Sequence, residues 1–116
     1  MTAQLKINDQ PVRESRMHFR VRMRRSIEFV LADGNPRFGI CLNLSLGGMQ
    51  IETAEPGAFG ARVTVYMELE GIEGLTELPG VVRWTKPGVM GIQFDLHGVR
   101  VTYALLQMLT APPVGR

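Results

Sequence analysis

The segment of residues 62–70 alternates between polar and apolar side chains, and it constrains the fold more than any other feature of the chain. Val63, Val65, Met67 and Leu69 occupy every second position. This period of two is typical of a β-strand with one buried face. The chain is therefore expected to contain a sheet that covers a core on one side.

Five further segments resemble strands, and Gly- or Pro-containing turns separate them: residues 26–31, 38–44, 49–52, 78–86 and 90–94. In the segment 38–44, the alternation places Phe38, Ile40, Leu42 and Leu44 on one face. The glycine-containing stretch 71–77 is expected to be a loop. Six short strands favour a six-stranded antiparallel β-barrel, because closure removes exposed sheet edges.

The C-terminal segment differs from the rest of the chain. Val101, Ala104, Leu105 and Met108 follow helical spacing, which predicts an α-helix over residues 98–109 that covers one mouth of the barrel. Asp95 is expected to cap its start. The fold class is therefore mainly β, with a C-terminal α-helix.

The length and composition fit one soluble domain. A chain of 116 residues can bury a single core, and 45% hydrophobic with 21% charged residues is ordinary for a globular protein. No apolar stretch is long enough for a membrane span, and the N-terminus lacks the apolar region of a secretory signal. The single cysteine, Cys41, is expected to pack in the core as a small hydrophobe. These features together favour a cytoplasmic protein.

The charge is distributed unevenly along the chain. We expect a leader at residues 1–12, a domain at 13–110 with a basic arm (13–25), a barrel (26–95) and the helix, and a tail at 111–116. The basic arm holds six arginines and one acid, and the net charge of the whole chain is +2. Arginine presents a planar fork of donors that suits phosphate oxygens and the edge of guanine. The arm is therefore expected to attract anions, although a solvated charge run would have the same composition.

Two short motifs carry the most functional information. Arg16 and Arg20 are four residues apart, a spacing that can bracket a compact anionic ligand. Asn43, Ser45 and Gly48 then interrupt an apolar strand with polar groups and a glycine. Asn43 and Ser45 could hydrogen-bond a ligand, and a positive φ at Gly48 would bring the backbone close to it. The alternative is a tight turn whose side chains satisfy local backbone groups.

In this order and spacing, the two motifs resemble the RxxxR and [D/N]xSxxG motifs of the PilZ domain family of bacteria, and the likeness extends over nearly the whole chain. The resemblance implies a split β-barrel that binds the second messenger cyclic di-GMP through Arg16, Arg20, Asn43, Ser45 and Gly48. Gly47, Arg83 and Ser15 are further candidates. An Asp is commoner in the family at the position of Asn43. The residue before RxxxR, here Ser15, varies with whether one or two dinucleotides are held, so the stoichiometry stays open.

No catalytic or metal site is predicted, because neither histidine has a partner at metal-ligand spacing. No catalytic cofactor is expected, and the only small-molecule partner is the nucleotide. The resemblance implies a receptor whose basic arm is ordered by the ligand and which signals to a separate, unidentified protein. Two alternatives remain: a basic-armed barrel that binds single-stranded nucleic acid nonspecifically, and an interaction module without a ligand. An aromatic content of 7% disfavours nucleic acid, because few rings are available for base stacking.

Overall fold

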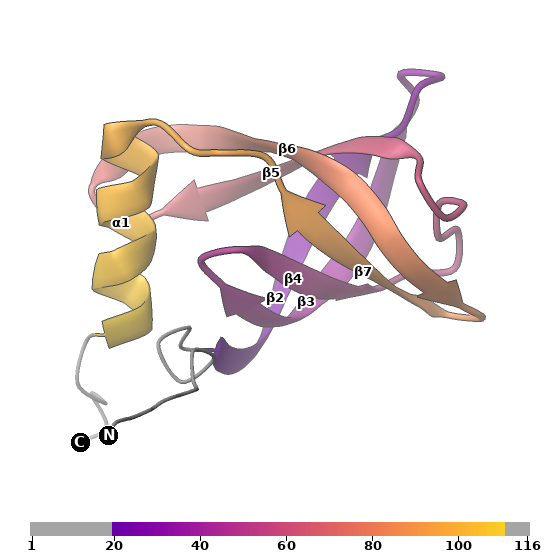
Figure 1. Ribbon diagram of the computed structural model, residues 1–116, viewed down its shortest axis with the longest axis horizontal. Coiled ribbons are helices and arrows are strands. Elements are labelled where there is room, and N and C mark those ends of the chain that lie inside the picture. Colours follow the sequence, from indigo (N-terminus) through magenta and orange to yellow (C-terminus); the bar gives the residue numbers. More distant parts are fainter. Residues whose placement is uncertain (1–19, 111–116) are drawn as a thin grey trace, which may run out of the picture.

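The computed structural model describes residues 20–110, in which six antiparallel strands close into a barrel with the order β2-β3-β4-β7-β6-β5. The elements are β2 (Arg20–Val30), β3 (Pro36–Ser45), β4 (Gly48–Glu52), β5 (Arg62–Leu69), β6 (Ile72–Lys86), β7 (Val89–Phe94) and α1 (Val99–Thr110). Figure 1 shows α1 packed across one end of the barrel. The predicted fold class is confirmed.

The core lies inside the barrel and beneath α1. Val63, Val65, Met67 and Leu69 of β5 are all buried, so the alternation in this strand predicted its inner face correctly. The helix buries Ala104, Leu105 and Leu109, and the remaining stripe residues Val101 and Met108 are partly buried against the same core. The predicted apolar stripe of the helix is therefore confirmed.

β2 begins six residues before the predicted start of the barrel. Arg20, Val21 and Arg22 pair with Ser45, Leu44 and Asn43 of β3. Val21 and Met23 pack partly against the core, while Arg20, Arg22 and Arg24, which alternate with them, face solvent. The boundary between arm and barrel, predicted at residue 26, thus lies inside β2, because the arginines hid an ordinary strand alternation.

A bulge changes the inner face of β3. The pairing register shifts between Cys41 and Asn43 against β4, and β2 shifts opposite the same point. Before the bulge, Phe38 is 69% exposed and Cys41 is fully buried, whereas Leu44 is buried after it. The prediction that one face holds Phe38, Ile40, Leu42 and Leu44 was wrong for this reason: one extra residue reverses the alternation.

Two local predictions were also wrong. The stretch predicted as a loop at 71–77 is mostly strand, because β6 starts at Ile72 and pairs with β5 beyond a turn at Gly71, whose φ is 88°. Asp95 does not cap α1, which begins four residues later; its carboxylate accepts from both terminal nitrogens of Arg62. This pairing lowers the pKa of Asp95.

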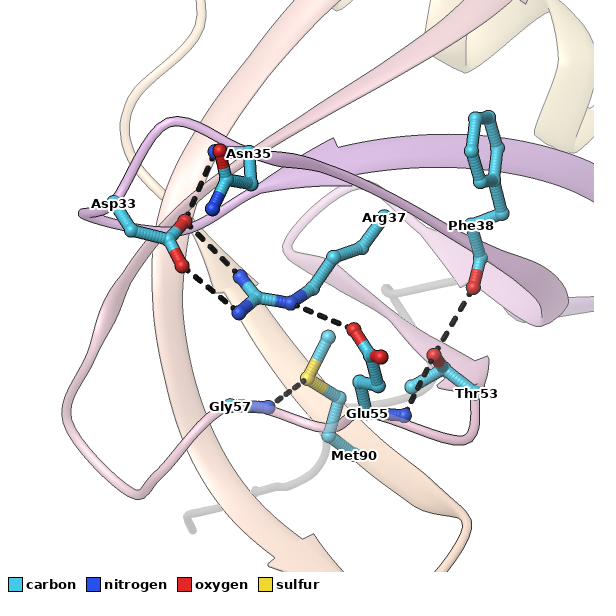
Figure 2. A network of polar contacts seen from close by, with 8 residues as sticks. All are labelled: Asp33, Asn35, Arg37, Phe38, Thr53, Glu55, Gly57 and Met90. Atoms are coloured by element: carbon cyan, nitrogen blue, oxygen red, sulfur yellow. Dashed lines mark hydrogen bonds and ion pairs between the residues drawn. The ribbon is translucent and has the colours of Figure 1, made fainter.

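The end of the barrel away from α1 carries a network of polar contacts (Figures 1 and 2). Arg37 donates to Asp33 at 2.9 Å and to Glu55 at 3.0 Å, so one guanidinium joins the β2–β3 turn to the chain after β4. The Asn35 backbone N–H also donates to Asp33, and this bond, followed by Arg37, lowers the pKa of Asp33. Thr53 completes the network by donating to the Phe38 carbonyl and accepting from the Glu55 backbone N–H.

Within residues 20–110, no helix has both the length and the hydropathy that crossing a lipid bilayer would require.

Candidate functional site

A row of directly paired residues crosses five strands on the outside of the barrel. Arg22 of β2 pairs with Asn43 of β3, Asn43 with Gln50 of β4, Gln50 with Gly91 of β7, and Gly91 with Trp84 of β6. Paired residues of antiparallel strands project from the same face of a sheet. The sheet therefore gathers a guanidinium, two amides and an indole on one surface, although they are distant in sequence.

The asparagine of the predicted motif is fixed by hydrogen bonds on both sides. Arg20 donates through Nη1 to Asn43 Oδ1 at 2.6 Å. Asn43 in turn donates through Nδ2 to Gln50 Oε1 at 2.7 Å. Arg20, Asn43 and Gln50 thus form a chain of side chains over β2, β3 and β4.

Trp84 lies directly over Gly91. A Cβ at Gly91 would come within 2.1 Å of the indole nitrogen, so glycine is the residue that leaves room for the ring there. The Lys86 ammonium lies 5.6 Å from the centre of the indole ring. Arg83, next to Trp84, is exposed and donates through Nε to Gln93 Oε1.

Two hollows lie on this surface, and Gln50 lines both of them. The first, of about 90 Å³, has Arg20, Arg83 and Trp84 in its wall. The second, of about 570 Å³, is lined by Arg22, Met23, Arg24, Leu42, Asn43 and Gln50. Arginine side chains from two separate parts of the sequence therefore border one continuous polar surface.

The turn after β3 uses its polar groups internally. Ser45 is only 5% exposed, and its hydroxyl donates to the Gly48 carbonyl and accepts from the Gly48 N–H, each at 3.2 Å. Gly48 does not have the positive φ that was expected. It is needed for another reason: a Cβ at this position would lie 2.0 Å from the Ile92 carbonyl oxygen of β7. Ser45 and Gly48 thus shape the turn from within.

The end of β7 and the β7–α1 connection contact the backbone carbonyls of the same turn. The Phe94 backbone N–H donates to the Gly47 carbonyl at 2.8 Å. His97 Nε2 lies 3.1 Å from the Leu46 carbonyl oxygen, and its ring packs edge-on against Phe94 with 5.1 Å between centroids. Gly47 itself is exposed, and a Cβ there would meet no atom within 4 Å.

Arg20 and Arg83, which border the smaller hollow, differ in their partners from three other arginines, one of which, Arg24, lines the larger hollow. Among the described residues, Arg24, Arg37 and Arg62 each pair with a carboxylate. Arg20 and Arg83 instead donate to the neutral amide oxygens of Asn43 and Gln93. Because an amide does not neutralise a guanidinium, the surface keeps two positive charges that are already directed by hydrogen bonds.

A larger cavity, of about 800 Å³, lies elsewhere, at the seam between β2 and β5. Its lining holds the three carboxylates Glu28, Glu68 and Glu70 and one guanidinium, Arg25, which donates to the Glu68 backbone carbonyl. This excess of negative charge would repel a phosphate. The cavity is therefore a poor candidate for an anionic ligand despite its size.

The predicted site residues separate into three groups. Arg20, Asn43 and Arg83 come together on the outer face, whereas Ser45, Gly47 and Gly48 form the turn at its edge. Arg16 and Ser15 lie outside the described residues. Sequence reasoning did not single out Gln50 and left Trp84 without a role. The available signal was Gln50 itself, a polar residue between the apolar Met49 and Ile51 in a strand.

Cys41 is fully buried, and burial raises the pKa of its thiol to about 11. The thiol therefore stays protonated near neutral pH, and its predicted packing in the core is confirmed. Over residues 20–110, no three side chains of the metal-binding types are grouped closely enough to hold a metal ion.

Comparisons with known proteins agree with this architecture. The family model described as the PilZ domain matches residues 14–111. Three solved structures share the fold, with TM-scores of 0.63 to 0.64. The PilZ domain of CeSA from a cellulose-synthesizing bacterium is 17% identical, and the match covers 78% of this chain and 93% of that one.

The other two structures are each 20% identical, and each match covers 83% of this chain. One is the inhibitor of motility MotI/DgrA from Bacillus subtilis, half of whose chain is covered; the other is the PilZ domain of YcgR from Escherichia coli with cyclic di-GMP, of which 89% is covered. A comparison with curated protein sequences gives no significant match. Since the family model spans most of its length, the chain belongs to the PilZ domain family.

Proposed function

We propose that this protein is a receptor for cyclic di-GMP and binds it on the outer face formed by β2, β3, β4, β7 and β6. The observation that carries the proposal is the pair Arg20 and Arg83, which border one hollow and, among the described residues, donate to neutral amide oxygens rather than to carboxylates. Cyclic di-GMP carries two phosphates and two guanines, so it offers both the charge and the hydrogen-bonding edges that such arginines prefer. The structure of the YcgR domain with cyclic di-GMP supports the choice of ligand.

Four side chains of the face have roles in this proposal. Arg20 and Arg83 bind phosphate oxygens or the O6 and N7 edge of guanine. Trp84 offers its indole as a stacking surface for a purine, an interaction worth about 1–3 kcal/mol per base in single-stranded nucleic acid complexes. Asn43 directs Arg20 and offers its amide to a guanine edge.

The remaining motif residues act in other ways. Arg16 is proposed as a second ligand-binding arginine, on the basis of the RxxxR motif that it forms with Arg20. Ser45 and Gly48 are proposed to maintain the shape of the turn, because their polar groups and close contacts are already used inside it.

The output is proposed to be a change in residues 13–19, which precede β2 and carry two of the six arginines of the basic arm. A bound dinucleotide would neutralise neighbouring guanidinium groups and allow them to settle against the barrel. The changed surface would then be recognised by a separate protein in the cytoplasm. In this proposal the domain performs no chemistry on its ligand.

Calorimetric titration of the full chain with cyclic di-GMP tests the proposal. Arg16→Ala and Arg20→Ala should each weaken binding by about 2–3 kcal/mol, the upper range for hydrogen bonds to charged groups, with little change in the melting temperature. Arg100→Ala is the matched control, because Arg100 is an exposed arginine on α1. Wild-type affinity in both motif variants would contradict the site assignment.

A second titration distinguishes the receptor from a nonspecific nucleic-acid binder. Binding of single-stranded oligonucleotides releases counterions and falls steeply with salt. Binding of a single dinucleotide that also uses base edges should depend less on salt, and cyclic di-GMP should bind more tightly than cyclic di-AMP. If an oligonucleotide binds more tightly than cyclic di-GMP, the receptor function is wrong.

A further inference from the structure

Asn43 has a chemical requirement that an aspartate at the same position would not have. A carboxylate accepts hydrogen bonds through both oxygens, whereas a carboxamide accepts through Oδ1 and only donates through Nδ2. If the amide were rotated by half a turn, Nδ2 would face the Arg20 guanidinium, and two donors would meet. The 2.6 Å bond from Arg20 therefore requires one of the two amide orientations.

Gln50 fixes that orientation. It lies directly opposite Asn43 in the β3–β4 ladder, and its Oε1 accepts from Asn43 Nδ2 at 2.7 Å. Both side chains are half-buried, so water competes less for these groups than on an open surface. With Nδ2 held by Gln50, Oδ1 is left facing β2, where Arg20 reaches it.

We infer that Gln50 is a positioning residue: it orients the Asn43 amide, and the oriented amide holds Arg20 in the geometry that binds the nucleotide. The identity of the ligand in this inference, cyclic di-GMP, rests on the proposed function. The hydrogen bonds that join Arg20, Asn43 and Gln50 do not depend on that function, because the structure contains them. The inference also explains how this chain uses an asparagine at a position where a carboxylate would need no orienting partner.

The alternative is that Gln50 contacts the nucleotide directly, since it lines both hollows. The two roles differ in how they depend on residue 43. A positioning role disappears when residue 43 becomes a carboxylate, because either oxygen can then accept from Arg20. A direct contact with the ligand is lost equally in both backgrounds.

A double-mutant cycle measures this difference. Gln50→Met removes both polar groups at nearly constant length, and its effect on cyclic di-GMP affinity is measured with Asn43 and with Asn43→Asp. We expect Gln50→Met to weaken binding about fivefold with Asn43, the effect of one hydrogen bond, and less than about twofold with Asn43→Asp. Gln107→Met on the exposed face of α1 is the matched control. An equal loss in both backgrounds, or no loss in either, would overturn the inference.

Side-chain NMR of the protein without ligand gives a second readout, which is independent of the proposed function. The Arg20 guanidinium signals should show restricted rotation in the wild type, free rotation in Gln50→Met, and restricted rotation again in the double variant. If this pattern appears but cyclic di-GMP does not bind the wild type, the proposed function is wrong and the positioning role stands. If Arg20 is equally restricted in the wild type and Gln50→Met, the positioning role is wrong.

Discussion

Two arginine clusters on the same barrel show how the partner of a guanidinium decides what it can do. At the end away from α1, Arg37 pairs with Asp33 and Glu55, and its side chain is only 21% exposed. On the outer face, Arg20 is exposed and donates to the amide of Asn43. Both arginines connect separate segments of the chain, but within residues 20–110 only Arg37 of the two has carboxylate partners that neutralise its charge.

This difference separates a structural cluster from a binding surface. A guanidinium between two carboxylates has no remaining attraction for an anion, because a phosphate would meet the repulsion of both acids. A guanidinium held by an amide is oriented in the same way but keeps its full charge. Neutral hydrogen-bond partners are therefore a useful sign of an anion-binding arginine in a structure without ligand.

The largest expected effect concerns the turn that supports the outer face. Gly48→Ala should destabilise the protein by about 3 kcal/mol, the upper range for overpacking, because the new Cβ would overlap the Ile92 carbonyl of β7. Gly47→Ala, next in sequence, should change stability by less than about 0.5 kcal/mol, since a Cβ there meets no atom. Chemical denaturation measures both variants. Equal stabilities would show that the turn does not constrain the face.

The difference between the two clusters is tested most directly by removing one arginine from each of them. Arg83→Ala should weaken cyclic di-GMP binding by about 1.5–3 kcal/mol, the range for hydrogen bonds to charged groups, and leave the melting temperature nearly unchanged, because Arg83 is exposed. Arg37→Ala should leave the affinity unchanged and lower the melting temperature, because it removes the ion pairs that connect β3 to the β2–β3 turn and to the chain after β4. Calorimetry measures the affinity of each variant for cyclic di-GMP, and thermal denaturation measures its melting temperature. If Arg37→Ala also reduced the affinity for cyclic di-GMP, the distinction between a structural cluster and a binding surface would be wrong.

The smallest effect is a dependence of stability on acid at the neutralised cluster. The pKa of Asp33 is lowered from its ordinary value of 3.8, first by the Asn35 N–H and then by Arg37. A carboxyl with a lowered folded-state pKa stabilises the protein above its ordinary pKa and loses this contribution as the pH falls through the lowered value. Wild type should therefore melt higher than Asp33→Asn near neutral pH, and the difference should shrink below pH 3.8. A difference that is constant with pH would show that the carboxylate charge is not involved.

The sequence predicted the parts of the fold that depend on regular repetition. The alternation in β5 and the helical spacing in α1 correspond to the observed buried faces, because both elements are uninterrupted. The inner face of β3 was predicted wrongly because a bulge at residue 42 reverses its alternation, and no single residue type marks a bulge of this kind. The start of β2 was missed because its outward positions are arginines, which resemble a solvated run.

The sequence predicted some of the residues of the candidate site, but it did not predict how the sheet places them next to one another. The motif identified Arg20 and Asn43, yet their direct hydrogen bond depends on the register between β2 and β3. Gln50 and Trp84 enter the row through the pairing of β4 with β7 and of β7 with β6, which single-sequence reasoning does not supply. Ser45 and Gly48 were expected to face a ligand, whereas the structure turns their polar groups inward.

The hydrogen bonds behind the Ser45–Gly48 turn also affect the entropy of binding. Phe94 and His97 hold the carbonyls of Gly47 and Leu46, and Ser45 closes the turn on itself. A segment with so many internal bonds has lost most of its conformational freedom when the protein folds, and it loses little more when a ligand arrives. The turn is therefore preorganised, and the cost of fixing it is included in the folding free energy rather than subtracted from the affinity.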